Sequence, residues 1–370
     1  TAVKIKDVNN ISLKNCTIKN AKLSEGALTI SNSKNIKLSY ITITDTVDIP
    51  GMFIYQNSYV TADNLLIHDL KRSLIAVNAG SHLSITDSVF HHSQGNAFYI
   101  ASQSSFEIFN SSISYTDYPA LFVRDSQCIA KSNSFSNTKE NAISICSSND
   151  FLLEKNTINN ISDTAVQVSD DSAGIIKDNT IYEVEGNGIY CNHSIVQLKD
   201  NEIFDLVYPA IAIASRTRAR LIGNKVSNIE HCGICVRNAK DVRIENSEIK
   251  DINESGISIS DTENCIIENN KITNCSLTSI EAYNKSNVYI KNNIISHMGK
   301  HAFLVYTSGY MKVENNQIND VKDEMVKMSY KGGGDFVNNK ISNCLKLNDC
   351  KTSSFYFLSG NGDFENITND

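Results

Sequence analysis

The sequence has no basic tract. Its 370 residues carry a net charge of −7, and Arg216, Arg218 and Arg220 form only one local basic group. This balance argues against a nucleic-acid surface, so we expect no nucleic-acid partner. There is also no signal peptide and no apolar run of membrane-spanning length, and Ala2 already lies in a strand-like segment. We therefore expect no membrane association.

A zinc-ligand pattern is missing as well. Cys232 and Cys235 form a Cys-x-x-Cys beside His231, but no second cysteine pair stands at a zinc-ligand spacing. The sequence therefore gives little support for a structural zinc ion, and no motif in it requires a cofactor.

What the sequence does contain is a short repeat, best seen in residues 242–264. Three apolar alternations lie in these 23 residues, and the groups of turn-forming residues between them are Asn-, Ser- and Asp-rich. Each alternation has the in-out-in pattern of a strand with one buried face. Gly256 opens the third strand. Three strands joined by polar corners predict one coil of a solenoid.

The repeat has a fixed period of 22 or 23 residues. The apolar residue after the first corner recurs at Ile67, Phe90, Ile113, Phe135, Ile158, Ile181, Ile203, Val226, Ile249, Ile272, Ile295, Ile318 and Ile341. A coil this short excludes helix pairs and propeller blades, and it predicts a parallel β-helix in which each strand pairs with its counterpart one coil away.

An asparagine column supports this fold. Two positions before the recurring apolar residue stand Asn133, Asn156, Asn179, Asn201, Asn224, Asn270, Asn293, Asn316 and Asn339, with Ser247 as the one interruption. Amides stacked at the strand spacing can bond along the column. With this ladder the chain resembles the right-handed parallel β-helix proteins of the pectate-lyase-like superfamily, including those with carbohydrate-binding and sugar-hydrolase repeats.

We predict an all-β fold: a single right-handed parallel β-helix over residues 1–370, with about fifteen coils of three strands each. Residues 1–50 are expected to form less regular coils, and residues 331–370 an irregular end. Open ends of such a helix expose strand edges. We therefore expect flanking segments in a longer protein to cover them, and we expect a monomer.

Most of the ten cysteines occupy apolar positions of the repeat. Cys128, Cys191, Cys265 and Cys275 stand where other coils carry Ile, Val or Phe. Buried cysteines far apart along the axis cannot form disulfides. We expect most of them to be free thiols, which favours a reducing, cytoplasmic compartment.

Outward positions of the third strand form columns that contain aromatic residues. Such side chains can stack on sugar rings, or they can pair across strands and stabilise the sheet. The candidates for ligand binding on this face are Tyr99, Phe122, Arg124, Gln167, Asn192 and Arg216.

The candidate catalytic group stands at the corner after the third strand. Asp170 and His193 occupy equivalent places in successive repeats, with Tyr190 close by in sequence. A carboxylate that orients an imidazole beside a tyrosine can remove and return a sugar-ring proton, as lyases and epimerases require. The alternative is a surface ion pair in a polar corner.

A row of acids precedes the third strand. Asp117, Glu140 and Asp163 are successive members, and stacked carboxylates of this kind can bind Ca²⁺. A solvated acidic face is the alternative.

Two functions follow. The resemblance implies a polysaccharide-interacting module, with lyase or epimerase activity as one form of it. The alternative is a non-catalytic solenoid that recognises a protein partner with its outward face, as in β-helix repeats of intracellular adaptors. The motif set of polygalacturonases and the Asp-Pro-His-Asp motif of mannuronan epimerases are absent, so no named enzyme is indicated.

Overall fold

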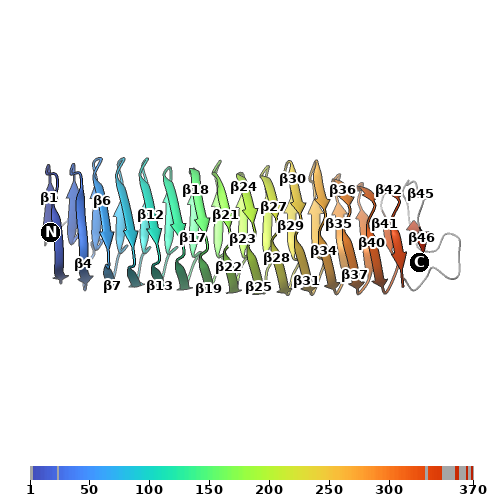
Figure 1. Ribbon diagram of the computed structural model, residues 1–370, viewed down its shortest axis with the longest axis horizontal. Helices are drawn as coiled ribbons and strands as arrows, with labels where there is room; N and C mark the ends of the chain where they lie inside the picture. The colour runs from blue at the N-terminus through green and yellow to red at the C-terminus, as the bar shows by residue number, and fades with distance from the viewer. Residues whose placement is uncertain are drawn as a thin grey trace. The chain divides into compact units, whose positions relative to one another are not determined.

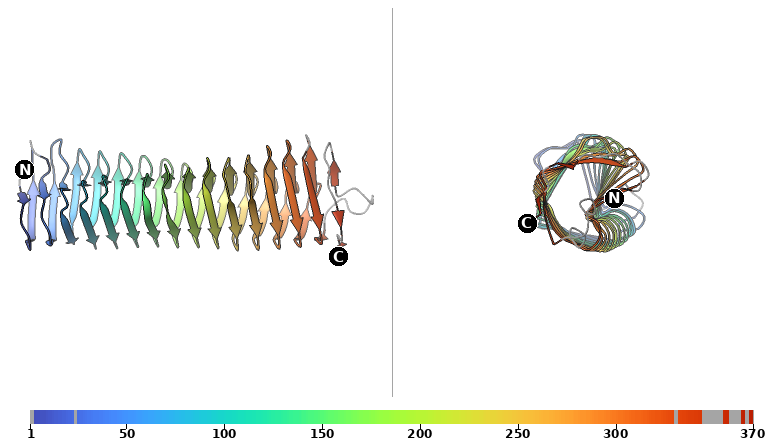
Figure 2. Two further views of the ribbon diagram at one scale, coloured as in Figure 1. Left: turned by 90° about the horizontal axis from the view of Figure 1, so that it is seen from above. Right: turned by 90° about the vertical axis from the view of Figure 1, so that its right-hand side faces the viewer.

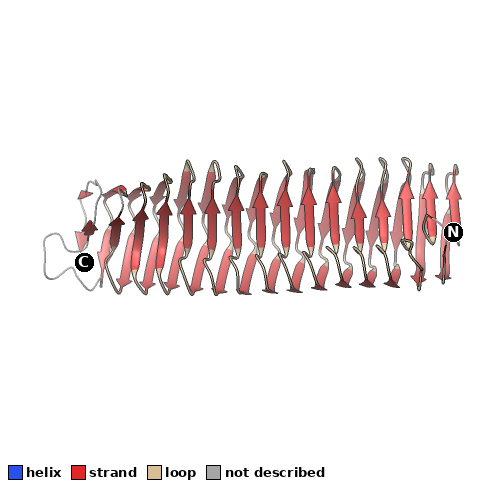
Figure 3. Cartoon of the chain, turned by 180° about the vertical axis from the view of Figure 1, so that it is seen from behind, coloured by secondary structure: helices blue, strands red, loops and turns tan. Residues whose placement is uncertain are grey.

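The computed structural model describes residues 3–22, 25–329 and 332–343, and the strands at 355–357, 364–365 and 368–369. Within this part of the chain all regular structure is β-strand, joined by turns (Figure 3). Contacts between Cα atoms divide the chain into two compact units, Thr1–Gly186 and Asn187–Asp370. Both units are built from coils of three short strands (Figure 1).

The first unit has three rows of strands. The first row is β1 (Val3–Lys6), β3 (Leu28–Ser31), β5 (Met52–Tyr55), β8 (Ile75–Val77), β11 (Phe98–Ile100), β14 (Leu121–Arg124), β17 (Ile143–Cys146) and β20 (Val166–Ser169). The second row is β6 (Tyr59–Asp63), β9 (His82–Thr86), β12 (Ser105–Phe109), β15 (Gln127–Lys131), β18 (Asn149–Glu154) and β21 (Ala173–Lys177). The third row is β7 (Leu66–Leu70), β10 (Val89–Ser93), β13 (Ser112–Thr116), β16 (Ser134–Thr138), β19 (Thr157–Ile161) and β22 (Thr180–Val184).

The first coils differ from the rest. There a single long strand replaces the separate strands of the second and third rows. These long strands are β2 (Ser12–Lys19) and β4 (Ile36–Thr44), and β4 pairs with both β6 and β7.

The second unit repeats the three rows. The first row is β23 (Ile189–Asn192), β26 (Ile211–Ala214), β29 (Ile234–Arg237), β32 (Ile257–Ser260), β35 (Thr278–Tyr283), β38 (His301–Tyr306), β41 (Val326–Ser329) and β44 (Phe355–Phe357). The second row is β24 (Ile195–Lys199), β27 (Arg218–Ile222), β30 (Val242–Glu245), β33 (Cys265–Glu268), β36 (Asn287–Lys291), β39 (Tyr310–Glu314), β42 (Gly333–Val337) and β45 (Phe364–Glu365). The third row is β25 (Glu202–Leu206), β28 (Lys225–Ile229), β31 (Glu248–Ile252), β34 (Lys271–Cys275), β37 (Ile294–Met298), β40 (Gln317–Val321), β43 (Lys340–Ser342) and β46 (Thr368–Asn369).

The fold is therefore the predicted parallel β-solenoid. Within each unit the described strands pair in parallel with their counterparts in the neighbouring coil, for example Ile234 with Ile257 in β29 and β32, and Ile249 with Ile272 in β31 and β34. Within each unit the three rows lie on different sides of the coil (Figure 2). Much of the predicted irregular end, residues 331–370, lies outside the described residues.

The interior of each coil is filled by the columns that the period predicts. The recurring apolar residues after the first corner, from Ile67 to Ile341, are all buried. Full burial of such side chains contributes about 1.5–3 kcal/mol each, before the entropy of ordering is subtracted. Stability thus comes from stacking like residues on like residues, coil by coil.

Asparagine ladders bond successive coils at the corner between the second and third rows. In the second unit the backbone N–H of Asn270 donates to Oδ1 of Asn293 over 2.9 Å, and the backbone N–H of Asn293 donates to Oδ1 of Asn316 over 2.8 Å. Ser247 continues the chain of bonds, because its Oγ accepts from the Asn224 N–H at 3.2 Å. The predicted column is confirmed, with a hydroxyl in place of one amide.

A second ladder, which we did not predict, occupies the corner between the first and second rows. Its members are serine and threonine. In the first unit the N–H of Ser58 donates to Oγ of Ser81 over 3.1 Å, and the N–H of Ser104 donates to Oγ of Ser126 over the same distance. Buried backbone groups at two corners of each coil are thereby paired.

The third-row strands share one further feature, a residue in the left-handed conformation at their fourth position. Asp69, His92 and Tyr115 have φ values of 57°, 54° and 56°, and His297 has 61°. Such a residue interrupts the alternation of a strand, so the third and fourth side chains both face outward while the second and fifth are buried. Each coil therefore presents two neighbouring outward side chains on this row.

Candidate functional site

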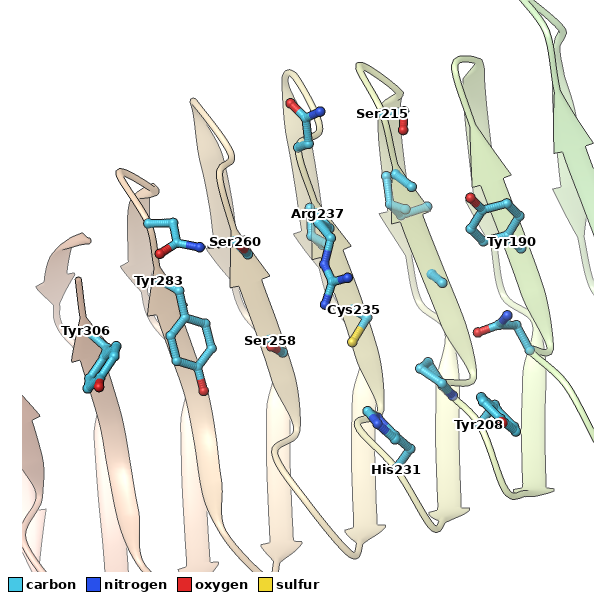
Figure 4. Close-up of a pocket in the computed structure, with 18 of the residues that line it drawn as sticks. Tyr190, Tyr208, Ser215, His231, Cys235, Arg237, Ser258, Ser260, Tyr283 and Tyr306 are labelled. Carbon is cyan, nitrogen blue, oxygen red and sulfur yellow. Dashed lines mark hydrogen bonds between the residues drawn. The ribbon is translucent and has the colours of Figure 1, made fainter. Parts of the chain in front are cut away.

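The best-formed groove in the second unit lies on the outward face of the first row. Two columns of side chains cross it. One runs through Ala212, Cys235 and Ser258 and the other through Ala214, Arg237 and Ser260, in strict register. Because most of these residues are small, the middle of the face is low, and large side chains border it at both ends (Figure 4).

The groove has a volume of about 780 Å³ and crosses β23, β26, β29, β32, β35 and β38. Five steps of strand spacing amount to about 24 Å. Its principal side chains are Tyr190, Tyr208, His231, Cys235, Arg237, Ser258, Tyr283 and Tyr306. Asn187, Asn238 and Asn284 add amides from the turns at its edges.

Tyrosines form the two ends of the groove. Tyr283 and Tyr306 come from neighbouring strands, and their ring centroids are 6.0 Å apart at an interplanar angle of 73°. At the other end stand Tyr190 on β23 and Tyr208 in the turn before β26, and Tyr208 is 53% exposed. A chain lying between these ends would meet aromatic faces at both (Figure 4).

Tyr283 is held by a carboxylate beside the groove. Ser255 Oγ donates to Oε2 of Glu281 at 2.9 Å, and the Tyr283 hydroxyl also bonds to Glu281. Burial raises the pKa of Tyr283 far above its ordinary range, and the hydrogen bond to Glu281 raises the pKa further. Tyr283 is therefore a neutral hydrogen-bonding and stacking group at physiological pH.

Arg237 is the cation in the middle of the groove. It is exposed, and among the described residues no carboxylate lies within ion-pair distance of its guanidinium. Three other arginines of this unit are paired with carboxylates: Arg218 with Asp241 at 3.3 Å, Arg220 with Glu245 at 2.5 Å, and Arg243 with Glu245 at 3.0 Å. An exposed guanidinium above a floor of small side chains can pair with a carboxylate of a ligand.

An imidazole and a carboxylate stand at the edge of the groove. Nδ1 of His231 lies 3.2 Å from Oε2 of Glu254 and 2.9 Å from the backbone nitrogen of Cys232. This pair is a candidate proton acceptor and donor beside the groove. Next to it, Cys232 and Cys235 form a disulfide, so their sulfurs are not thiolate ligands in this state.

The remaining cysteines of the described residues are free, as we expected for most of them. They are Cys16, Cys128, Cys146, Cys191, Cys265 and Cys275. Burial raises the pKa of Cys128 and of Cys265 to about 12. Five of the six are buried, and none of them lines the groove.

The predicted catalytic residues fall in different units. Asp170 stands in the turn after β20 in the first unit, where Oγ of Ser169 donates to its Oδ2 at 3.1 Å. His193 stands at the turn after β23 in the second unit and is exposed, and Tyr190 lines the groove there. The catalytic assignment of the three residues stays a prediction.

The residues predicted to bind a ligand in the first unit are partly engaged with one another. Tyr99 and Phe122 stack with centroids 5.4 Å apart, and the guanidinium of Arg124 lies 5.2 Å from the Phe122 centroid. Gln167 accepts a hydrogen bond from Asn141 at 2.7 Å. The stack is the cross-strand arrangement that we considered as the alternative to sugar binding. Ligand binding by these residues stays a prediction.

Two further predicted ligand-binding residues, Asn192 and Arg216, belong to the second unit. Asn192 is at the end of β23 and its side-chain Oδ1 is buried, whereas Arg216 is exposed in a turn. Neither lines the groove, and their role stays a prediction.

The predicted calcium ligands lie along the first unit. Asp117 pairs with Lys139 at 2.7 Å, Glu140 is exposed, and Oδ1 of Asp163 accepts from the Thr164 N–H at 2.8 Å. Lys139 thus stands between the first two acids in sequence and neutralises one of them. A calcium site on these three residues stays a prediction.

Most of the groove was missed by the sequence analysis, although a signal for it exists. The outward columns were visible, but we weighed single aromatic residues and not the run of small residues at positions 212, 214, 258 and 260 between tyrosines. A stretch of small outward residues bordered by large ones is what makes a depression on a flat sheet.

The sequence matches the family described as the right-handed beta helix region, over residues 1–96, 73–226 and 209–368. These ranges cover nearly the whole chain, so the protein belongs to the right-handed β-helix family. No curated protein matches the sequence.

Solved structures of similar fold include a mannuronan C-5 epimerase module and a glucanase. The A-module of a mannuronan C-5 epimerase from Azotobacter vinelandii is 9% identical, with a TM-score of 0.45 and coverage of 85% of this chain and 90% of that one. The catalytic unit of a GH87 alpha-1,3-glucanase from Streptomyces thermodiastaticus is 11% identical, with a TM-score of 0.50 and coverage of 95% and 62%. At such identities the likeness extends to the fold alone.

Within the described residues there is no helix long enough and apolar enough to span a membrane.

Proposed function

We propose that this protein binds an acidic polysaccharide along the groove of the second unit. The observation that carries the proposal is the combination in one groove of four tyrosines and an exposed arginine without a carboxylate partner among the described residues. Pyranose rings have apolar faces that stack on aromatic rings, and their hydroxyl groups suit the amides and hydroxyls at the groove edges.

The positive charge of Arg237 favours a uronic acid polymer over a neutral one. The whole chain carries a net charge of −7, so an anionic polymer gains nothing from long-range attraction. Arg237 supplies local recognition instead, through paired hydrogen bonds to a carboxylate. Binding should therefore depend on the carboxylate of the sugar more than on the overall charge of the polymer.

The binding test uses the purified protein with polygalacturonate, alginate and a neutral glucan, followed by calorimetry or affinity electrophoresis. Arg237→Met should weaken binding of the acidic polymers about tenfold or more, since a charge-assisted hydrogen bond is lost. Arg218→Met is the matched control, because Arg218 is also exposed and pairs with Asp241 outside the groove. Equal effects of the two substitutions would contradict the proposal.

The aromatic part of the groove has its own control. Tyr283→Ala should reduce affinity for the acidic polymer, whereas Tyr289→Ala should not, because Tyr289 lies on β36 and bonds to Glu314 away from the groove. Preferential binding of the neutral glucan by the wild type would show that the arginine is not the determinant we infer.

We further propose, as the catalytic form of this function, lyase or epimerase chemistry whose candidate residues in the second unit are Tyr190, which lines the groove, and His193, in the turn after the same strand. A base removes the proton beside the uronate carboxylate, and the resulting anion either expels the glycosidic oxygen, as in a lyase, or regains a proton on the opposite face, as in an epimerase. The products to measure are unsaturated chain ends and solvent deuterium incorporated into the polymer.

The activity assay should be run with and without Ca²⁺, because Asp117, Glu140 and Asp163 are predicted ligands for it. His193→Gln should abolish either product. Binding of the polysaccharide without formation of either product would indicate a non-catalytic binding module. Absence of binding across the whole panel would favour the alternative function, recognition of a protein partner by the outward face.

A further inference from the structure

A second group of chemically active side chains lies in the first unit, away from the groove. It consists of His68 and Asp69 on β7, and His91 and His92 on β10. The two strands are neighbours in the third row, and His68 is in register with His91. We call these four residues the histidine cluster.

The left-handed fourth position of these strands creates the cluster. Asp69 and His92 both adopt positive φ, so each faces outward beside the histidine that precedes it. Two coils thus contribute two side chains each to a compact array, in which three of the four members are imidazoles. In an ordinary strand the alternate side chain would have been buried.

The side chains are within contact distance of one another. Nδ1 of His68 lies 2.6 Å from Oδ2 of Asp69, and Nδ1 of His91 lies 2.7 Å from Nδ1 of His92. The rings of His68 and His91 stack with centroids 4.9 Å apart. One ligand atom from each of His68, Asp69 and His91 falls within 4.8 Å of the other two.

We propose that His68, Asp69 and His91 form a binding site for a borderline divalent transition-metal ion such as Zn²⁺. Two imidazoles and one carboxylate are a ligand set typical of zinc, with a position left for water or a ligand. His92 orients the site, because its contact with Nδ1 of His91 fixes that ring and leaves Nε2 for the ion.

Space beside the cluster suits an open coordination position. A second groove of about 540 Å³ is lined by Asp69, Lys71, His92, Tyr115 and Lys139, among others. Tyr115 stacks on His92 at 4.7 Å between centroids and supports that ring.

Two other groups of potential ligands occur in the described residues, and both are less suited. In the group of His231, Cys232 and Cys235, the sulfurs form a disulfide. In the group of His301, Asp323 and Glu324, the imidazole is only 4% exposed and its Nδ1 already contacts the backbone oxygen of Glu324 at 3.1 Å.

The test is calorimetric titration of the chelator-treated protein with Zn²⁺, supported by the visible absorption spectrum with Co²⁺. We expect one equivalent to bind, and His91→Gln to weaken that binding at least about tenfold, as the loss of a ligand demands. His68→Gln should have a similar effect. Circular dichroism without metal checks that both variants are folded.

His297→Gln is the matched control. His297 occupies the fourth position of β37, the place that His92 has in β10, and pairs with Asp320 at 3.2 Å, but among the described residues it has no second imidazole next to it. This variant should bind Zn²⁺ like the wild type. The proposal is overturned if His91→Gln and His297→Gln bind equally, or if the wild type shows no binding.

Discussion

At the scale of single residues, the chemistry of the protein depends on side chains that the repeat leaves free to vary. Arg237 and Ser258 stand in outward columns whose other members include alanine, cysteine and glutamate. The inward neighbours of these residues are isoleucine and valine, and they are buried. The backbone therefore fixes the position of each outward side chain, while the chemistry of the groove depends on which residue type stands at a few of these positions.

Tyr283 gives a pH prediction at this scale. Its pKa is raised in the folded protein, chiefly by burial, so the folded state holds the proton more tightly than the unfolded state. The stabilising contribution is complete below the unfolded pKa of about 10, and it declines as the pH rises above that value towards the folded pKa.

The measurement is urea unfolding at about pH 9 and about pH 11, values that bracket the ordinary tyrosine pKa. The wild type should lose more stability between them than Tyr283→Phe does. Tyr208→Phe serves as control because Tyr208 is exposed. Identical losses in wild type and Tyr283→Phe would show that the proton on Tyr283 is not held by burial and Glu281.

At the scale of the strand and its corner, the two ladders determine how one coil attaches to the next. Asn293 illustrates the density of bonds: its Oδ1 accepts from the backbone and the amide of Asn270, and its Nδ2 donates to the oxygens of Ile267 and Lys291. Removing it would leave buried backbone groups of neighbouring coils without partners.

Asn293→Ala should therefore destabilise the second unit by about 2–4 kcal/mol, the cost of several lost hydrogen bonds including buried ones. Asn253→Ala is the matched change, since Asn253 is exposed in the turn after β31 and its backbone does not adopt a positive φ. That variant should stay within about 0.5 kcal/mol of the wild type. Chemical unfolding followed by circular dichroism measures both, and equal effects would contradict the role of the ladder.

The corner residues also show where sequence analysis succeeds and where it fails. The asparagine column was predicted because one residue type recurs, and Ser247 was the recognised exception. The serine and threonine ladder was missed because serine is common in every turn of this sequence. The left-handed fourth position was missed too, although spacings such as Ile249 to Ile252 depart from strict alternation.

At the scale of the whole chain, repeat register makes coils interchangeable. Ala219 pairs with Val242, and Val242 pairs with Cys265, so the residues on either side of a coil already share one register. Stability in such a protein is the sum of coils and their interfaces. The length of the chain can then change by whole coils without loss of the fold.

Deleting residues 242–264 should give a folded protein one coil shorter, because β27 then meets β33 in register. Deleting only residues 242–252 should prevent folding of the second unit, because apolar side chains would move to outward positions. Circular dichroism and size-exclusion chromatography distinguish these results. Similar behaviour of the two deletions would contradict coil-by-coil register.

The fold was predictable at this scale because a single period governs nearly every apolar residue. The sites were not, because they depend on differences between coils. The groove needs small residues at 212, 214, 258 and 260 with tyrosines at both ends, and the histidine cluster needs two particular coils to be adjacent. Averages over the repeat remove such differences.

The left-handed fourth position has a consequence for how such a protein changes over generations. It places a pair of solvent-facing side chains on every coil, outside the apolar interior, and its backbone conformation favours Asn, Asp and His at the second of the two positions. Exchanges among these residue types cost little folding free energy, yet each can add an imidazole, a carboxylate or an amide next to those of the adjoining coils. A lineage can therefore acquire and discard binding chemistry on this row while its core stays the same.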